Sequence, residues 1–305
     1  MNSKENEIKN SSESGENRTY AYVILLIATF FWGFQAVPLK FLLEEWTSQT
    51  ITCVRYFLFS GMIFAWLYYK NGTIMPPREA WKPLLLMASC LVLNNTIQIA
   101  GIKYTTVVNA TLISATNPVN TAVLSFLILK ERLSGFAWIG IVLSFAGALT
   151  VVSNGDVSVI TEARFGFGDV LTYVGVCFWG LYAVVTPRVL KFISVPMATG
   201  WSAFIAAWLA LALNLVTHQV DVVPLTMTGT LCFLFVLICG GLLSNLLWNR
   251  GVEIVGPAIA AMFSNILPLV GILSGYLIMG DEITVAKALG AILVICGVRL
   301  AARKN

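Results

Sequence analysis

The chain has 305 residues, of which 58% are apolar and only 11% are charged, whereas about 25% of the residues in a soluble domain are charged. Its mean hydropathy is +0.82. These values exclude a soluble globular protein, a disordered chain and a collagen-like repeat. The apolar runs are continuous rather than alternating, which predicts an all-α polytopic membrane protein.

Residues 1–19 are polar and predict a disordered cytoplasmic tail. Ten apolar runs follow, and each is long enough for a transmembrane helix. They lie at about 20–43, 48–69, 82–100, 105–129, 135–153, 168–190, 196–217, 227–247, 255–279 and 284–301. The loops between them are short, so we expect consecutive helices to be antiparallel neighbours.

The Lys and Arg residues predict the orientation in the membrane. If the N-terminus is cytoplasmic, 14 of the 19 basic residues fall on the cytoplasmic side and 5 on the other. Basic residues gather on the cytoplasmic side of membrane proteins, so both termini are expected there.

The second half of the chain repeats the first. Phe31-Trp32-Gly33 returns as Phe178-Trp179-Gly180, an offset of 147. Further on, the offset is 150, and the matched pairs are Asn95 with Asn245, Gly101 with Gly251, Ser114 with Ser264, Pro118 with Pro268, Gly140 with Gly290, and Gly147 with Gly297. Matches in register over this length indicate an internal duplication, with repeats at 20–153 and 168–302.

Each repeat contains five predicted helices, so the second repeat enters the membrane inverted relative to the first. Inverted repeats are typical of secondary transporters, whose substrate site lies near the membrane midplane between the repeats.

Several stretches resemble a known family. They are Phe31-Trp32-Gly33, Arg55-Tyr56-Phe57-Leu58, Gly101-Ile102-Lys103-Tyr104-Thr105-Thr106, Asn117-Pro118-Val119 and Lys130-Glu131-Arg132-Leu133-Ser134. Together with ten helices, this ordered set resembles the EamA-type family of the drug/metabolite transporter superfamily. Lys130-Glu131 departs from the family's usual Gly-Glu, and the counterpart of Lys103 is Glu253.

The resemblance implies a transporter of small metabolites in the bacterial inner or plasma membrane, with export of amino acids or related compounds. The alternatives within transport are uptake, or exchange of a cargo such as a sugar phosphate or nucleotide sugar. The alternative class is a membrane-embedded enzyme or a membrane scaffold without transport. The expected partners are a small-molecule substrate and the lipid bilayer, not nucleic acid; monomer and homodimer both stay open.

Polar and aromatic side chains within the apolar runs are the candidate substrate site, because polar groups inside a membrane gather where a cavity or a partner satisfies them. Asn95 and Asn245 are repeat counterparts, as are Gln35 and Tyr182. The predicted substrate-binding residues are Trp32, Gln35, Asn95, Gln98, Asn117, Trp179, Tyr182, Asn245, Trp248 and Asn265. For any single polar residue, bonding between packed helices is the alternative.

Four further residues are candidates for gating or coupling. Pro118 and Pro268 each remove a helical hydrogen bond, so they predict repeat-related kinks, which are either hinges or static. Lys103 and Glu131 lie at helix ends, where either charge can gate one mouth of the path. Other charges, Arg55 among them, are expected to snorkel to the interface. Gly271 and Gly275 form a GxxxG motif that predicts a helix contact.

The sequence contains no acidic residue at the centre of an apolar run, so it predicts no midplane proton carrier. It contains one histidine, His218, and no P-loop, and its six cysteines form no CxxC pair. We therefore expect no enzyme activity, no metal site and no cofactor.

Overall fold

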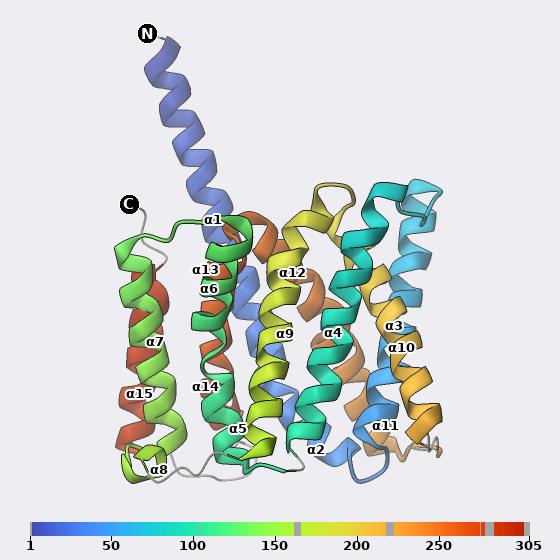
Figure 1. Cartoon of the computed structure of the whole chain (residues 1–305). Helices are drawn as coiled ribbons and strands as arrows, with labels where there is room; N and C mark the ends of the chain where they lie inside the picture. The colour runs from blue at the N-terminus through green and yellow to red at the C-terminus, as the bar shows by residue number, and fades with distance from the viewer. Residues whose placement is uncertain are drawn as a thin grey trace.

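The computed structural model describes residues 2–102, 104–161, 166–217, 223–274, 276–277 and 284–301. Within these ranges every regular element is a helix (Figure 1). The elements are α1 Asn2–Phe34, α2 Ala36–Leu42, α3 Ser48–Asn71, η1 Arg78–Ala80, α4 Trp81–Ile102, α5 Val107–Ser114, α6 Asn117–Leu129, α7 Gly135–Ser153, α8 Ser158–Thr161, α9 Phe167–Leu190, α10 Val195–Thr217, α11 Met227–Phe235, η2 Val236–Leu243, α12 Ser244–Val255, α13 Pro257–Met262, η3 Phe263–Ile266, α14 Leu267–Ser274 and α15 Val285–Ala301.

Local sequence signals set the ends of these helices. Thr47 begins α3 by accepting a hydrogen bond from the Thr50 amide, and Ser134 begins α7 in the same way. Gly72 ends α3 in the left-handed conformation (φ 68°), which glycine adopts without a Cβ clash. The predicted run at 135–153 matches α7 at both ends.

Four of the predicted runs are divided rather than continuous helices. The first is divided at Gln35, three residues before Pro38, and the fourth is divided between Ser114 and Asn117, next to Pro118. The eighth contains the π-helix η2, and the ninth contains the 3-10 segment η3 before Pro268. The eighth run also extends to Val255, not to 247 as the sequence predicted, because its last turns are helical and bury Trp248, Asn249 and Val252 in the bundle.

The N-terminal residues differ from the expected disordered tail, because α1 is one helix from Asn2 to Phe34. Proline is absent from this whole stretch, so a helix that is stable in the apolar part can continue outward. Figure 1 shows this part of α1 projecting from the bundle.

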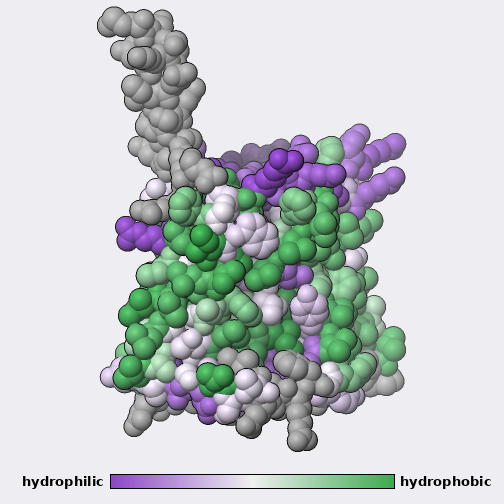
Figure 2. Space-filling view, turned by 60° about the vertical axis from the view of Figure 1, so that its left-hand side comes forward, coloured by the Kyte–Doolittle hydropathy of each residue, from purple (hydrophilic) through white to green (hydrophobic). Residues whose placement is uncertain are grey.

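Eight segments are long and apolar enough to cross a membrane, and they run from Asn17–Leu42 to Pro257–Ser274. The helices α4 and α15 complete the bundle, packing along α9 and α7 respectively. The arrangement is consistent with ten spans, and both chain ends lie on the same side of the bundle (Figure 1). Figure 2 shows an apolar belt with hydrophilic residues gathered at the end from which α1 projects.

The duplication seen in the sequence is also present in the helix packing. The contact of α4 with α9 has its counterpart in the contact of α1 with α12. Counterpart helices also pack against each other, as in the pairs α3 with α10 and α7 with α15, and α6 of the fourth run packs against α13 of its counterpart, the ninth run. The two repeats therefore interlock around a common centre instead of forming separate bundles.

Candidate functional site

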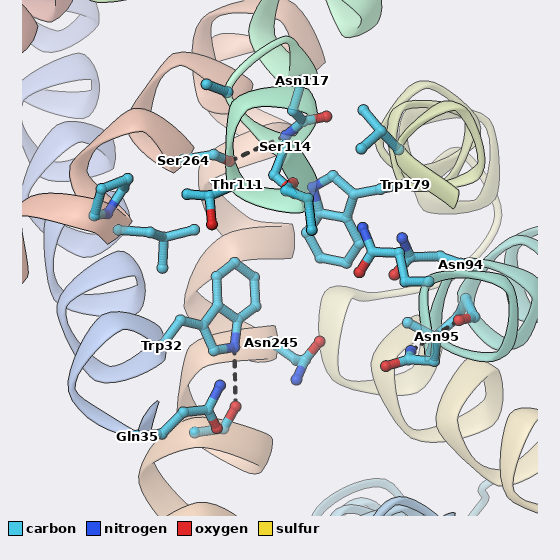
Figure 3. Close-up of a pocket in the computed structure, with 18 of the residues that line it drawn as sticks. Trp32, Gln35, Asn94, Asn95, Thr111, Ser114, Asn117, Trp179, Asn245 and Ser264 are labelled. Atoms are coloured by element: carbon cyan, nitrogen blue, oxygen red, sulfur yellow. Dashed lines mark hydrogen bonds between the residues drawn. The ribbon is translucent and has the colours of Figure 1, made fainter. Parts of the chain in front are cut away.

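A cavity of about 560 Å³ lies where the two repeats meet, and Figure 3 shows most of its lining. Its size falls within the range of about 300–1,000 Å³ that is usual for small-molecule sites. The lining residues come from both repeats and are Trp32, Gln35, Arg55, Tyr56, Leu91, Asn94, Asn95, Gln98, Ala110, Thr111, Ser114, Ala115, Asn117, Val176, Trp179, Gly240, Asn245, Ser264, Asn265, Leu267 and Pro268.

The cavity lies between the middle of the bundle and the face opposite the chain ends. Arg55 is about two turns from the start of α3, and Gln98 is about one turn from the end of α4. Both of these helix ends are on the face opposite the termini (Figure 1). On the terminal side, the bundle is filled by Tyr182 and Trp248, whose exposed fractions are 1% and 0%.

Two tryptophans form the aromatic wall of the cavity, and a third tryptophan and a tyrosine support them. The repeat counterparts Trp32 and Trp179 meet edge to face, with ring centroids 5.5 Å apart. The buried Trp248 ring lies 5.2 Å from Trp32 and 5.7 Å from Trp179, and the Tyr182 ring stacks on Trp179 at 5.3 Å. Trp32 and Trp179 thus present indole surface to the cavity, while Trp248 and Tyr182 support them from behind.

The π-helix η2 brings backbone to the cavity. Trp32 donates its indole N–H to the carbonyl of Gly240 at 2.9 Å, and Asn245 donates to the carbonyl of Gly241 at 2.7 Å. A Cβ at Gly240 would lie 2.1 Å from Oε1 of Gln35, so a larger residue there would displace the Gln35 side chain. π-helical turns within α-helices are frequent at functional sites.

Amide side chains hold the neighbouring helices around the cavity. Asn95 donates to the hydroxyl of Tyr56 at 3.0 Å and to the carbonyl of Leu91. Asn117 donates to the hydroxyl of Ser264 at 3.2 Å, joining α6 to η3 across the two repeats. Such bonds between packed helices are the alternative to a binding role for these amides. Asn95 and Asn117 make these bonds and also line the cavity.

The structure brings together eight of the ten predicted substrate-site residues. The residues that line the cavity are Trp32, Gln35, Asn95, Gln98, Asn117, Trp179, Asn245 and Asn265. Tyr182 and Trp248 do not line it. Tyr182 instead bonds to Asn249, whose amide also reaches Thr199 at 2.9 Å.

The four gating candidates lie in different places. Pro268 lines the cavity, and Pro118 is buried at the start of α6. Glu131 is on the terminal side, where its carboxylate accepts a hydrogen bond from Ser125 and lies beside Gly256. Lys103 is outside the described residues.

Sequence reasoning missed Arg55, and the expectation that it snorkels to the interface is wrong. Arg55 lines the cavity, its Cδ lies 3.3 Å from where a Cβ on Gly241 would be, and its guanidinium carbon is 5.3 Å from the Tyr56 ring centroid. The available signal was its position about two turns inside an apolar helix, on the same face as the buried Ile51 and Phe59. The lining residues Tyr56, Thr111 and Gly240 were also missing from the predicted site.

Comparison with known proteins identifies the two repeats. Residues 19–153 and again 166–303 match the EamA-like transporter family. A solved crystal structure has the same fold, with a TM-score of 0.78 at 16% identity, covering 93% of this chain and 97% of its own.

Full-length relatives agree with this assignment. The uncharacterized transporter YyaM of Bacillus subtilis is 26% identical over 282 residues, which are 91% of this chain and 92% of YyaM. An uncharacterized transporter of Archaeoglobus fulgidus is 23% identical over 93% of this chain and 98% of its own length. The chain belongs to the EamA-like transporter family and is a multi-pass membrane transporter of that type.

Proposed function

We propose that this transporter moves small metabolites by alternating access around the central cavity, and that it exports amino acids or related compounds. The observation that carries the proposal is the cavity of about 560 Å³ shared by the two inverted repeats. Transporters built from inverted repeats bind their substrate at such a position.

The lining of the cavity suits a small solute with both a polar and an apolar part. Asn94, Gln98 and Asn245 offer amide donors and acceptors, whereas Trp32 and Trp179 offer apolar surface. A few polar groups on a mainly apolar wall are the usual composition of a small-molecule site.

Alternating access needs a second state in which the cavity faces the chain ends. The described state has Tyr182, Trp248 and Asn249 packed on that side. Rocking of one repeat against the other would exchange the open and closed sides, because the repeats are related by inversion. The repeat-related breaks beside Pro118 and Pro268 are the proposed hinges.

The basic residues support a cytoplasmic location for both termini in a bacterial inner membrane. Lys70, Arg188 and Arg299 lie in the last turns of α3, α9 and α15. These three helix ends are on the same side as the termini (Figure 1). Positive residues favour the cytoplasmic side, so the cavity in this state faces outward.

The proposal is tested with purified protein in proteoliposomes. Vesicles loaded with one labelled solute are diluted into medium containing the same solute unlabelled or into medium without it. We expect exchange and efflux of at least one amino acid. Exchange of a sugar phosphate or nucleotide sugar alone would mean that the cargo is not an amino acid. If no solute in the panel crosses the membrane, the alternative of a scaffold without transport is favoured.

A further inference from the structure

Among the residues that the structure describes, Arg55 is a cation in the cavity without a protein anion. Its Nε atom is buried and has no hydrogen-bond partner in the described part of the chain. The described ion pair is elsewhere, between Arg250 and Glu253. The stem of Arg55 packs near Gly241, and its guanidinium lies near the ring of Tyr56, so the side chain is held in place.

The surroundings of Arg55 leave a place for one negative charge. The described residues that line the cavity include neither Asp nor Glu. An uncompensated charge within a membrane is costly, at roughly 2.5–3.5 kcal/mol even on the insertion scale. A guanidinium matches the planar carboxylate group, with which it can form two parallel hydrogen bonds.

Gln35 supplies a complementary group, a hydrogen-bond acceptor, beside Gly240, the neighbour of Gly241. Its Oε1 atom is buried without a hydrogen-bond donor in the described residues, and it lies against Gly240. Gly240 and Gly241 are consecutive residues of η2, so the Arg55 cation and the unsatisfied Gln35 acceptor lie beside neighbouring residues. A buried acceptor is satisfied by an N–H donor such as an ammonium group.

We propose that Arg55 binds the carboxylate and Gln35 the ammonium group of an apolar α-amino acid, whose side chain lies against Trp32 and Trp179. This assignment rests on the proposed transport function and specifies the substrate for it. A single guanidinium matches one carboxylate charge, whereas a phosphate carries about −1.5 to −2 at neutral pH.

The test uses three ligands that differ by one group. L-leucine carries both groups, isoamylamine lacks the carboxylate, and isocaproate lacks the amine. Binding to the purified full-length protein is measured by calorimetry and by competition against labelled L-leucine. We expect L-leucine to bind more tightly than either analogue by at least about tenfold, because each analogue loses a charge-assisted contact.

Variants assign the two contacts. Arg55→Gln should weaken L-leucine and isocaproate at least about tenfold but leave isoamylamine unchanged, and Arg55→Lys should retain part of the affinity. Gln35→Met should weaken L-leucine and isoamylamine but leave isocaproate unchanged. Arg78→Gln is the matched control, because Arg78 is an exposed cation outside the cavity.

Unchanged binding of one analogue shows that each variant is folded, so every result decides the assignment. Equal weakening of all three ligands by Arg55→Gln would mean a structural role and would overturn it. Dependence of L-leucine binding on chloride, tested against sulfate at equal ionic strength, would mean that an inorganic anion pairs with Arg55. If L-leucine does not bind although another solute is exchanged, the assignment of Arg55 and Gln35 is wrong, whereas the proposed transport function is retained.

Discussion

Gly140 and Gly297 lie face to face where α7 crosses α15. A Cβ on Gly140 would lie 2.5 Å from the carbonyl oxygen of Gly297, and a Cβ on Gly297 would lie 2.7 Å from that of Gly140. Gly147 and Gly290 make the same contact, at 2.7 and 2.8 Å. Since Gly140 corresponds to Gly290 and Gly147 to Gly297, the duplicated sequence builds a two-fold related interface.

Gly140→Ala is expected to destabilise the protein, because the added methyl group meets the backbone of the facing helix rather than a movable side chain. Overpacking of this kind costs typically about 1–3 kcal/mol. Gly61→Ala in α3 is the control, since a Cβ there meets nothing within 4 Å and alanine favours the helix. Thermal unfolding in detergent should show a lower midpoint for Gly140→Ala only; equal midpoints would contradict the close crossing.

The sequence predicted the duplication but did not identify the glycines at which α7 crosses α15 as a helix contact. The repeat offset marked Gly140, Gly147, Gly290 and Gly297 as counterparts, yet the motif chosen for packing began at Gly271. In the structure a Cβ on Gly271 meets nothing within 4 Å, and Gly275 is outside the described residues. Spacing shows that two glycines share a face of one helix, whereas the contact depends on which helix lies opposite.

The repeat counterparts Trp32 and Trp179 should respond differently to substitution by phenylalanine. The indole N–H of Trp32 bonds to the carbonyl of Gly240, whereas that of Trp179 has no described protein partner. Trp32→Phe removes this hydrogen bond and should lower stability by about 0.5–1.5 kcal/mol. Trp179→Phe should leave stability unchanged and weaken substrate binding. Unfolding and calorimetry on both variants check this; identical stability losses would contradict the assignment.

The contact of Glu45 with Thr226, on the face opposite the termini, is expected to depend on pH. The hydroxyl and amide of Thr226 donate to its carboxylate at 2.6 and 2.7 Å, and these bonds hold the pKa of Glu45 below its ordinary value. A lowered pKa in the folded state means that the contact stabilises above the ordinary value and is lost as pH falls through the lowered one. Wild type should unfold at a higher temperature than Glu45→Gln at neutral pH, and the difference should vanish on acidification. A difference in unfolding temperature that grows on acidification would contradict this expectation.

Transport is expected to depend weakly on a pH gradient. The described part of the cavity lining contains no carboxylate, and Glu131 is bonded to Ser125 on the terminal side. An imposed pH step without a substrate gradient should therefore give no sustained accumulation in vesicles, in wild type or in Glu131→Gln. Sustained accumulation that Glu131→Gln abolishes would show proton coupling through this residue.

The eight predicted residues that line the cavity could be selected from the sequence because amides and tryptophans are conspicuous within apolar runs. Trp248 and Tyr182 were misplaced, since helical spacing gives the face of a residue but not its depth behind Trp32 and Trp179. The π-helix η2 could not be predicted, because its apolar sequence is equally compatible with an ordinary α-helix. Arg55 was assigned to the interface on its distance from the helix start, although only the tertiary structure shows what surrounds it.

The most direct test of the account is to obstruct the cavity. Ser114 faces it, so Ser114→Trp places an indole in the space where the substrate is proposed to bind. Leu127→Trp on α6 is the control, because Leu127 is 62% exposed and outside the cavity lining. Both variants are reconstituted in proteoliposomes, and exchange of labelled amino acid is measured. The account predicts that Ser114→Trp abolishes exchange and that Leu127→Trp retains it; exchange at the wild-type rate by a folded Ser114→Trp protein would contradict it.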